Sequence, residues 1–116
     1  LRELAITRVG IQLGADYEVI AHKAIGRRVG IPENQIEALE AGSASDAFNE
    51  LEKAVLDYAD DLVDNANPGA GASATFDAVA KHLNAEEMVE LTIAITYYIM
   101  TSKFLLTFGI DLEDAG

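Results

Sequence analysis

The chain has 116 residues, and 20 Asp and Glu against 8 Lys and Arg give it a formal net charge of −12 at pH 7. This length predicts a single domain over residues 1–116, and a hydrophobic content of 50% is enough for a folded core. The negative charge argues against nucleic acid and anionic membranes as partners, and the absence of cysteine excludes disulfides, thiol redox chemistry, thiolate nucleophiles and cysteine-ligated zinc.

Glycine, proline and capping residues divide the chain into about six predicted helices. No stretch alternates with the period of two that a strand requires, so the predicted fold class is all-α. In chain order the helices are expected at 1–13, 16–29, 32–41, a segment that begins after Ser43 or Ser45, 73–83 and 84–108. Gly14 is expected to end the first helix and Gly30 to cap the second in a left-handed conformation. Residues 67–71 form the clearest loop.

An amphipathic stripe marks the fourth helix. Apolar residues recur there at steps of three and four, at Phe48, Leu51, Val55, Tyr58 and Leu62. Ser73 is expected to cap the fifth helix. Asn84 with Glu87 three residues later predicts a capping box at the start of the last helix.

The last helix is apolar nearly all round and is expected to be about 36 Å long. Residues 91–110 carry one charge, Lys103. A membrane span is disfavoured by that lysine, by the threonines and by the acidic run before the segment. A single small domain cannot surround such a helix on all sides, so we expect part of it to be buried by another subunit. The alternative is that the preceding helices cover it within one chain.

The second helix carries the most informative residues. Asp16, Lys23 and Arg27 fall on one side of a helical wheel, which is expected to face solvent. The opposite side carries a stripe of four residues, Glu18, His22, Ile25 and Val29. Burying a carboxylate without a partner is costly, and His22 is within reach of Glu18 at the i,i+4 spacing. Histidine exchanges protons near neutral pH, so the pair is a candidate acid–base site.

A structural interpretation of the same pair remains open. Glu18 and His22 could be an ordinary ion pair, or His22 a core residue that is hydrogen-bonded to its neighbour. The spacing is also half of a helical metal motif, but the second histidine of the zinc form is absent, so no metal is predicted.

Glu3 in the first helix is a second candidate. It shares a stripe with Thr7 and Gly10, and these small neighbours leave room for another helix or a ligand. The alternative is that Glu3 only stabilises the first turn through the helix dipole.

The order and spacing of several segments resemble the carboxymuconolactone decarboxylase and alkylhydroperoxidase D-like superfamily. The segments begin with Leu1–Ile6, Asp16–Glu18 with His22, and Gly30–Ile31, and continue with Phe76, 87–92, 97–100 and 108–111. The resemblance implies an all-α fold of trimers or hexamers with the active site near subunit contacts. It also implies that a preceding helix usual in the family is missing here.

The peroxidase branch of the superfamily has two cysteines between its glutamate and its histidine. On this chain that glutamate falls at Glu3 and the histidine at His22, whereas the cysteine positions fall at Ala15 and Glu18. A disulfide-cycling peroxidase mechanism is therefore excluded. The Glu18–His22 spacing is similar to that of the decarboxylase branch, whose members remove carbon dioxide from a lactone acid without a cofactor.

By this resemblance we expect cofactor-independent acid–base chemistry on a small anionic acid or lactone. His22 would be the proton donor or shuttle, Glu18 would orient its ring, and Glu3 would be a second carboxylate. Tyr17 could contact the substrate, and Arg28 or Arg8 could neutralise its charge. The alternative function is a non-catalytic helical oligomer that binds a ligand or partner. No signal peptide is expected at the start, because Arg2, Glu3 and Arg8 interrupt the first stretch. The lack of cysteine makes the reducing cytoplasm the expected compartment.

Overall fold

The computed structural model describes residues 1–65 and 73–110. Within these ranges the regular structure is helical, as predicted, and the expected loop at 67–71 lies outside them. The elements are α1 (Arg2–Leu13), α2 (Asp16–Arg28), α3 (Glu33–Ala38), the 3₁₀ turn η1 (Gly42–Ala44), α4 (Glu50–Asp64), α5 (Ala74–Ala80) and α6 (Ala85–Thr107).

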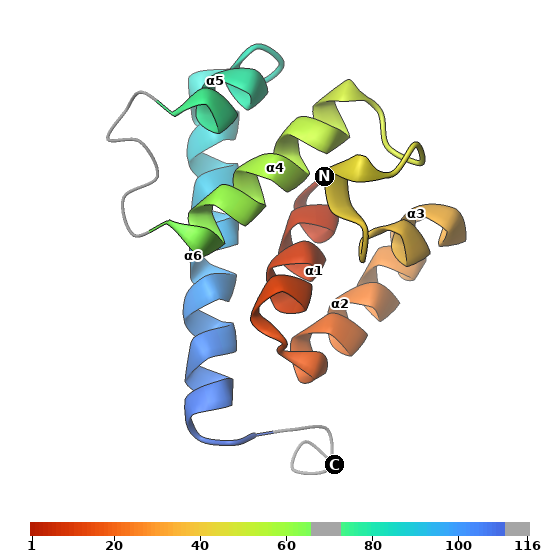
Figure 1. Cartoon of the computed structure of the whole chain (residues 1–116), viewed down its shortest axis with the longest axis vertical. Coiled ribbons are helices and arrows are strands. Elements are labelled where there is room, and N and C mark those ends of the chain that lie inside the picture. The colour runs from red at the N-terminus through yellow and green to blue at the C-terminus, as the bar shows by residue number, and fades with distance from the viewer. Residues whose placement is uncertain (66–72, 111–116) are drawn as a thin grey trace.

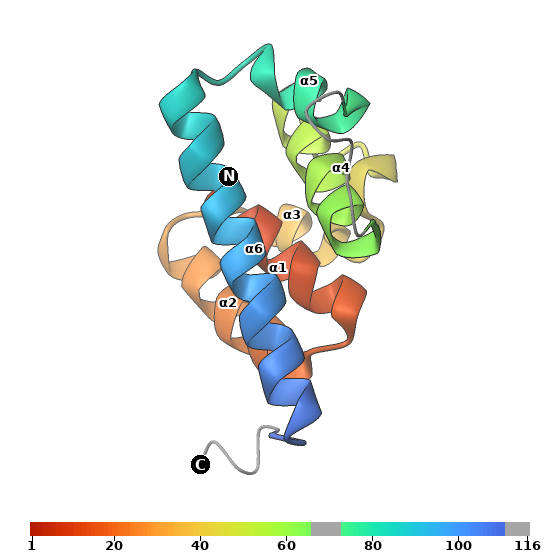
Figure 2. The same ribbon diagram turned by 90° about the vertical axis from the view of Figure 1, so that its left-hand side faces the viewer.

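Helix α1 lies at the centre of the molecule. It forms an antiparallel hairpin with α2, and α4 and α6 pack on its other sides (Figures 1 and 2). Every residue from Leu4 to Gly10 is buried. Gly14 ends the helix with φ of 69°, as predicted, because this left-handed conformation suits glycine and lets the chain reverse into α2.

The approach of α2 to α1 depends on Gly10. A Cβ atom at this position would lie 3.0 Å from Cγ2 of Val19 on α2. Any larger residue would therefore push the two helices apart. α2 therefore packs against the stripe of small residues predicted on α1, at Gly10.

The boundary between the third and fourth helices differs from the prediction. α3 ends at Ala38, and α4 begins after Asn49 and not after Ser43 or Ser45. Asn49 accepts a hydrogen bond from the backbone N–H of Glu52, and the Glu52 carboxylate accepts one from the N–H of Asn49. This capping box satisfies two backbone donors where a single serine would satisfy one. Phe48 is buried but precedes the helix that it was expected to join.

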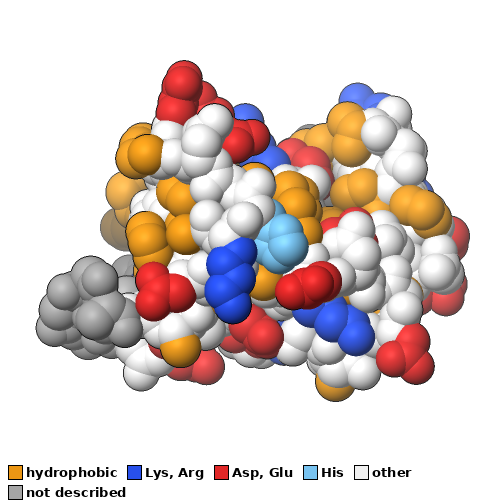
Figure 3. Space-filling view, turned by 90° about the horizontal axis from the view of Figure 1, so that it is seen from above, with side chains coloured by type: hydrophobic (Ala, Val, Ile, Leu, Met, Phe, Trp, Pro, Cys, Tyr) orange, Lys and Arg blue, Asp and Glu red, His pale blue; other side chains and the backbone are white. Residues whose placement is uncertain are grey.

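The last helix begins at the predicted capping box of Asn84 and Glu87. By length and composition α6 could cross a membrane, and 22% of its most apolar window is buried. One face carries exposed apolar side chains at helical spacing: Val89, Ile93, Tyr97, Met100 and Phe104. At the end of the molecule that carries α5 and the start of α6, hydrophobic side chains reach the surface among acidic ones (Figure 3).

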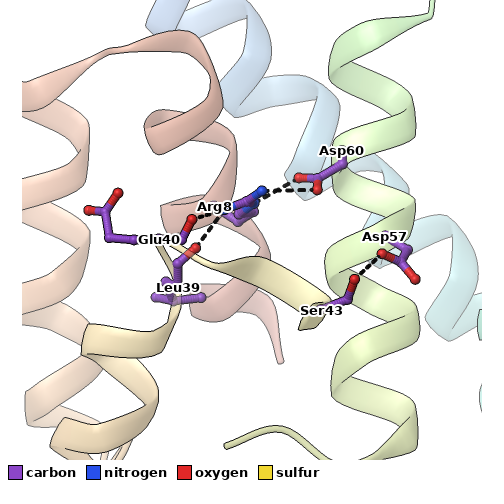
Figure 4. Close-up of polar contacts among 6 residues, drawn as sticks. All are labelled: Arg8, Leu39, Glu40, Ser43, Asp57 and Asp60. Atoms are coloured by element: carbon purple, nitrogen blue, oxygen red, sulfur yellow. Dashed lines mark hydrogen bonds and ion pairs between the residues drawn. The ribbon is translucent and has the colours of Figure 1, made fainter. Parts of the chain in front are cut away.

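Arg8 ties α1 to two other parts of the chain. Its Nε and one terminal nitrogen donate to the two carboxylate oxygens of Asp60 on α4, at 2.9 and 3.2 Å. Its other terminal nitrogen donates to the carbonyls of Leu39 and Glu40, at 2.7 and 2.9 Å (Figure 4). Gly42 packs against the guanidinium, and a Cβ there would lie 2.9 Å from its Cζ. Arg8 thus holds α1, α4 and the turn after α3 together.

Arg8→Ala should lower the free energy of unfolding by about 3 kcal/mol, because it leaves a half-buried carboxylate and two carbonyls without their donor. Urea unfolding followed by circular dichroism measures the change. Arg27→Ala, which breaks the exposed pair of Arg27 with Glu33, is the control and should change stability little. Equal effects of the two variants would contradict the role given to Arg8.

Asp61 links α4 to the start of α5. Hydrogen bonds from Thr75, Ser73 and Asn65 hold the pKa of its carboxyl below the usual range. A carboxyl group whose pKa is lowered in the folded state stabilises the fold at a pH above its unfolded-state pKa. This stabilisation is lost as the pH falls through the folded-state pKa.

Asp61→Asn should therefore flatten the fall in melting temperature below about pH 4. Asp46→Asn, at an exposed aspartate, is the control variant. The prediction is contradicted if the melting temperature of Asp61→Asn falls at low pH as steeply as that of the wild type.

Candidate functional site

His22 lies between two carboxylates from different helices. Its Nδ1 is 2.8 Å from Oε2 of Glu3 on α1, and its Nε2 is 3.1 Å from Oε2 of Glu18 on its own helix. His22 and Glu18 are buried, with 6% and 7% of their surface exposed. The three residues predicted to carry the chemistry therefore come together in one group, with a hydrogen bond between Glu3 and His22 and an ion-pair contact between His22 and Glu18. We call this group the Glu3–His22–Glu18 cluster.

The helix hairpin positions the three side chains. Glu18 and His22 are one turn apart on α2, so their contact is local. Glu3 reaches His22 only because α1 runs antiparallel to α2, and the close approach at Gly10 brings the two helices together. The small stripe of Glu3, Thr7 and Gly10 was thus correctly interpreted as room for another helix.

The buried line on α2 differs in part from the predicted stripe. It runs through Ala15, Glu18, His22 and Gly26, whereas Ile25 is half-buried and Val29 is 66% exposed. α2 ends at Arg28, and Ile31 folds back to within 3.2 Å of the Cβ position of Gly26. Val29 lies beyond this contact, which is why the expectation that it packs in line with His22 was wrong.

The two contacts of the imidazole differ in geometry. The contact of Nδ1 with Glu3 is a hydrogen bond. Nε2 lies within ion-pair distance of Glu18, but without the alignment of a hydrogen bond. The cluster therefore places one imidazole between two carboxyl groups, one hydrogen-bonded to it and one close to its other nitrogen.

Tyr98 on α6 is a neighbour of the cluster that the sequence did not single out as a site residue. Its ring packs edge-on against the His22 imidazole, with centroids 4.7 Å apart and planes at 78°. Tyr98 also lines a groove of about 670 Å³ between the start of α1 and α6. It therefore separates His22 from this groove. Only the tertiary structure reveals the contact, because His22 and Tyr98 are far apart in the chain and meet where α6 packs against the α1–α2 hairpin.

The three residues predicted to contact substrate lie elsewhere. Tyr17 is half-buried and lines a smaller groove of about 190 Å³ between the start of α2 and the end of α6. Arg28 is exposed at the last position of α2. Four of the N–H groups of Arg8 are used by Asp60 and the two carbonyls. A different cation, Arg2, lines the groove beside Tyr98.

The cluster does not have the geometry of a metal site. The two carboxylates lie on opposite nitrogens of one ring, so no single ion could bind the imidazole and both oxygens. Within residues 1–65 and 73–110, no group of three or more His, Asp or Glu side chains is arranged to hold a metal ion.

Comparison with known proteins places this geometry in a family. The family model described as the carboxymuconolactone decarboxylase family matches residues 1–61, which include α1, α2 and all three members of the cluster. No curated protein and no solved structure gives a significant match. Because the match covers more than half of the 116 residues and the described chain is all-helical, the chain belongs to the carboxymuconolactone decarboxylase family.

Proposed function

We propose that this protein is a cofactor-independent enzyme that transfers a proton to or from a small carboxylic acid or lactone in a decarboxylation-type reaction. The observation that carries the proposal is the imidazole of His22 held between Glu3 and Glu18. A histidine with a carboxyl group close to each ring nitrogen can take a proton on one side and release one on the other.

The chemistry requires a proton source and no external oxidant. When the bond between the substrate carbon and its carboxylate breaks, carbon dioxide leaves and the electron pair passes into the substrate's own conjugated carbonyl or double bond. The carbon then takes a proton from the enzyme, and water restores that proton. General acid catalysis of this kind contributes about 10² to 10⁴ in rate.

The exposure of the three side chains supports distinct roles. Glu3 is the most accessible, with 18% of its side chain exposed, against 9% for Glu18 and 8% for His22. In this proposal Glu3 is the end of the cluster that exchanges a proton with the substrate. His22 passes the proton, and Glu18 orients the ring and balances its charge.

A second candidate is a non-catalytic protein that binds a small ligand or partner. It is favoured by the burial of His22 and by the occupation of both its ring nitrogens, which a purely structural cluster would share. Turnover, and not structure, separates the two candidates.

The exposed apolar face of α6 supports a homo-oligomer, a trimer or hexamer by the family resemblance. Ile93 and Tyr97 belong to this face and also line the groove beside Tyr98. A second copy on α6 would therefore close the groove near the cluster.

The function is tested with small lactone and keto acids, first screened by thermal shift and then assayed for carbon dioxide release in D₂O. Wild-type protein should place deuterium on the carbon that loses its carboxylate. His22→Gln should keep its melting transition and lose at least about 10²-fold in rate. Glu18→Gln should slow the reaction and shift its pH optimum, because it removes a charge beside the imidazole.

His82→Gln is the matched control, since His82 lies in the turn before α6 and only approaches Glu50, at 3.9 Å. It should leave turnover unchanged. Binding without turnover for every compound in the screen would favour the second candidate.

Assembly is tested by light scattering at micromolar concentration. The scattering mass should be three or six times the 12.4 kDa of one chain. Met100→Glu places a charge on the exposed face of α6 and should reduce the mass, whereas the control Asn34→Glu adds the same charge on α3 and should not. A wild-type mass of one chain would contradict the oligomer.

A further inference from the structure

We propose that the groove beside Tyr98 binds the substrate and selects a monocarboxylate with an apolar body over a dicarboxylate. This inference rests on the proposed function, because it assigns a substrate class to the same site. The groove encloses about 670 Å³, which is within the usual range for a small-molecule site.

The groove adjoins the cluster at two points. Tyr98 lines the groove and also packs edge-on against His22. Arg2 lines the groove and precedes Glu3, the most accessible member of the cluster, in the chain. No member of the cluster lines the groove itself, so a molecule bound there reaches the cluster past Tyr98 and the first turn of α1.

The apolar part of the groove fits a hydrocarbon or aromatic body. Its aliphatic lining consists of Leu1, Leu83, Leu91, Ile93 and Ala94, with the rings of Tyr97 and Tyr98 beside them. Tyr98 is held in place on both sides, since its ring also packs edge-on against Tyr97 with centroids 5.1 Å apart. Burial of apolar ligand atoms on this surface increases affinity, whereas a strongly hydrated polyanion makes few favourable contacts with it.

The charges of the groove decide how many carboxylates it accepts. Among the described residues that line it, Arg2 is the one cationic side chain, and Glu87 and Glu90 are anionic. Glu87 is fixed in the capping box, where it accepts a hydrogen bond from the N–H of Asn84. One carboxylate can pair with Arg2, whereas a second would face the two glutamates without a counter-charge.

The test compares three probes that share a phenyl group: 3-phenylpropanoate, phenylsuccinate and 3-phenylpropan-1-ol. Calorimetric titration of the full chain should show the monoanion binding more tightly than both the dianion and the alcohol. Arg2→Gln should weaken binding of the monoanion about tenfold and leave binding of the alcohol unchanged. Glu90→Gln should strengthen binding of the dianion. Arg27→Gln removes an exposed arginine outside the groove and serves as the control.

Three results would overturn the inference. The first is tighter binding of the dianion than of the monoanion. The second is equal binding of the monoanion to Arg2→Gln and wild type. The third is monoanion binding only in Met100→Glu, which would show that a second copy fills the groove in the assembled protein.

A separate measurement keeps the two proposals distinguishable. Proton NMR should show a downfield imidazole N–H signal from the hydrogen bond to Glu3, which His22→Gln removes with or without a probe. If this signal and turnover persist while the probes fail to bind as expected, the groove assignment is wrong and the proposed function stands. If the probes bind as expected without turnover of any compound, the groove assignment stands and the enzymatic function is wrong.

Discussion

The burial of α1 on all sides is the constraint on which the rest of the structure depends. α2, α4 and α6 each pack against it, and no residue from Leu4 to Gly10 faces solvent. A helix in this position supplies the core with apolar contacts in every direction. It must also pair its own charged side chains inside the molecule, because an unpaired buried charge costs several kcal/mol.

Arg8 and Glu3, two of the three charged residues of α1, are paired in different ways. Arg8 has fixed partners, a carboxylate and two carbonyls, and arginine keeps its charge under all ordinary conditions. Its network is therefore static and structural. Glu3 instead pairs with an imidazole, a group whose proton can move. The same requirement for internal pairing thus yields a fixed arginine network on one side of α1 and the Glu3–His22–Glu18 cluster on the other.

The absence of cysteine gives the cluster its form. By the resemblance, Ala15 and Glu18 stand at the positions of the two cysteines in the peroxidase branch. Both residues are buried in line with His22. Glu18 thereby supplies the second nitrogen of His22 with a carboxylate partner. By the resemblance, this buried line would carry the cysteines in the peroxidase branch, whereas here it carries a carboxylate beside His22.

Local rules in the sequence determined the all-α class, the cap at Gly14, the capping box at Asn84 and the burial of Glu18 beside His22, because each depends on residues within one or two turns. Tertiary structure alone decided that Arg8 is an anchor, that Val29 is exposed and that Tyr98 covers His22. These outcomes depend on which helix packs against which, and contacts between residues distant in the chain leave no periodic signal in it. The surroundings of Glu3 were determined partly by the sequence and partly by the fold. Its small neighbours indicated room for another helix or a ligand, but only the tertiary structure showed that a helix carrying His22 packs there.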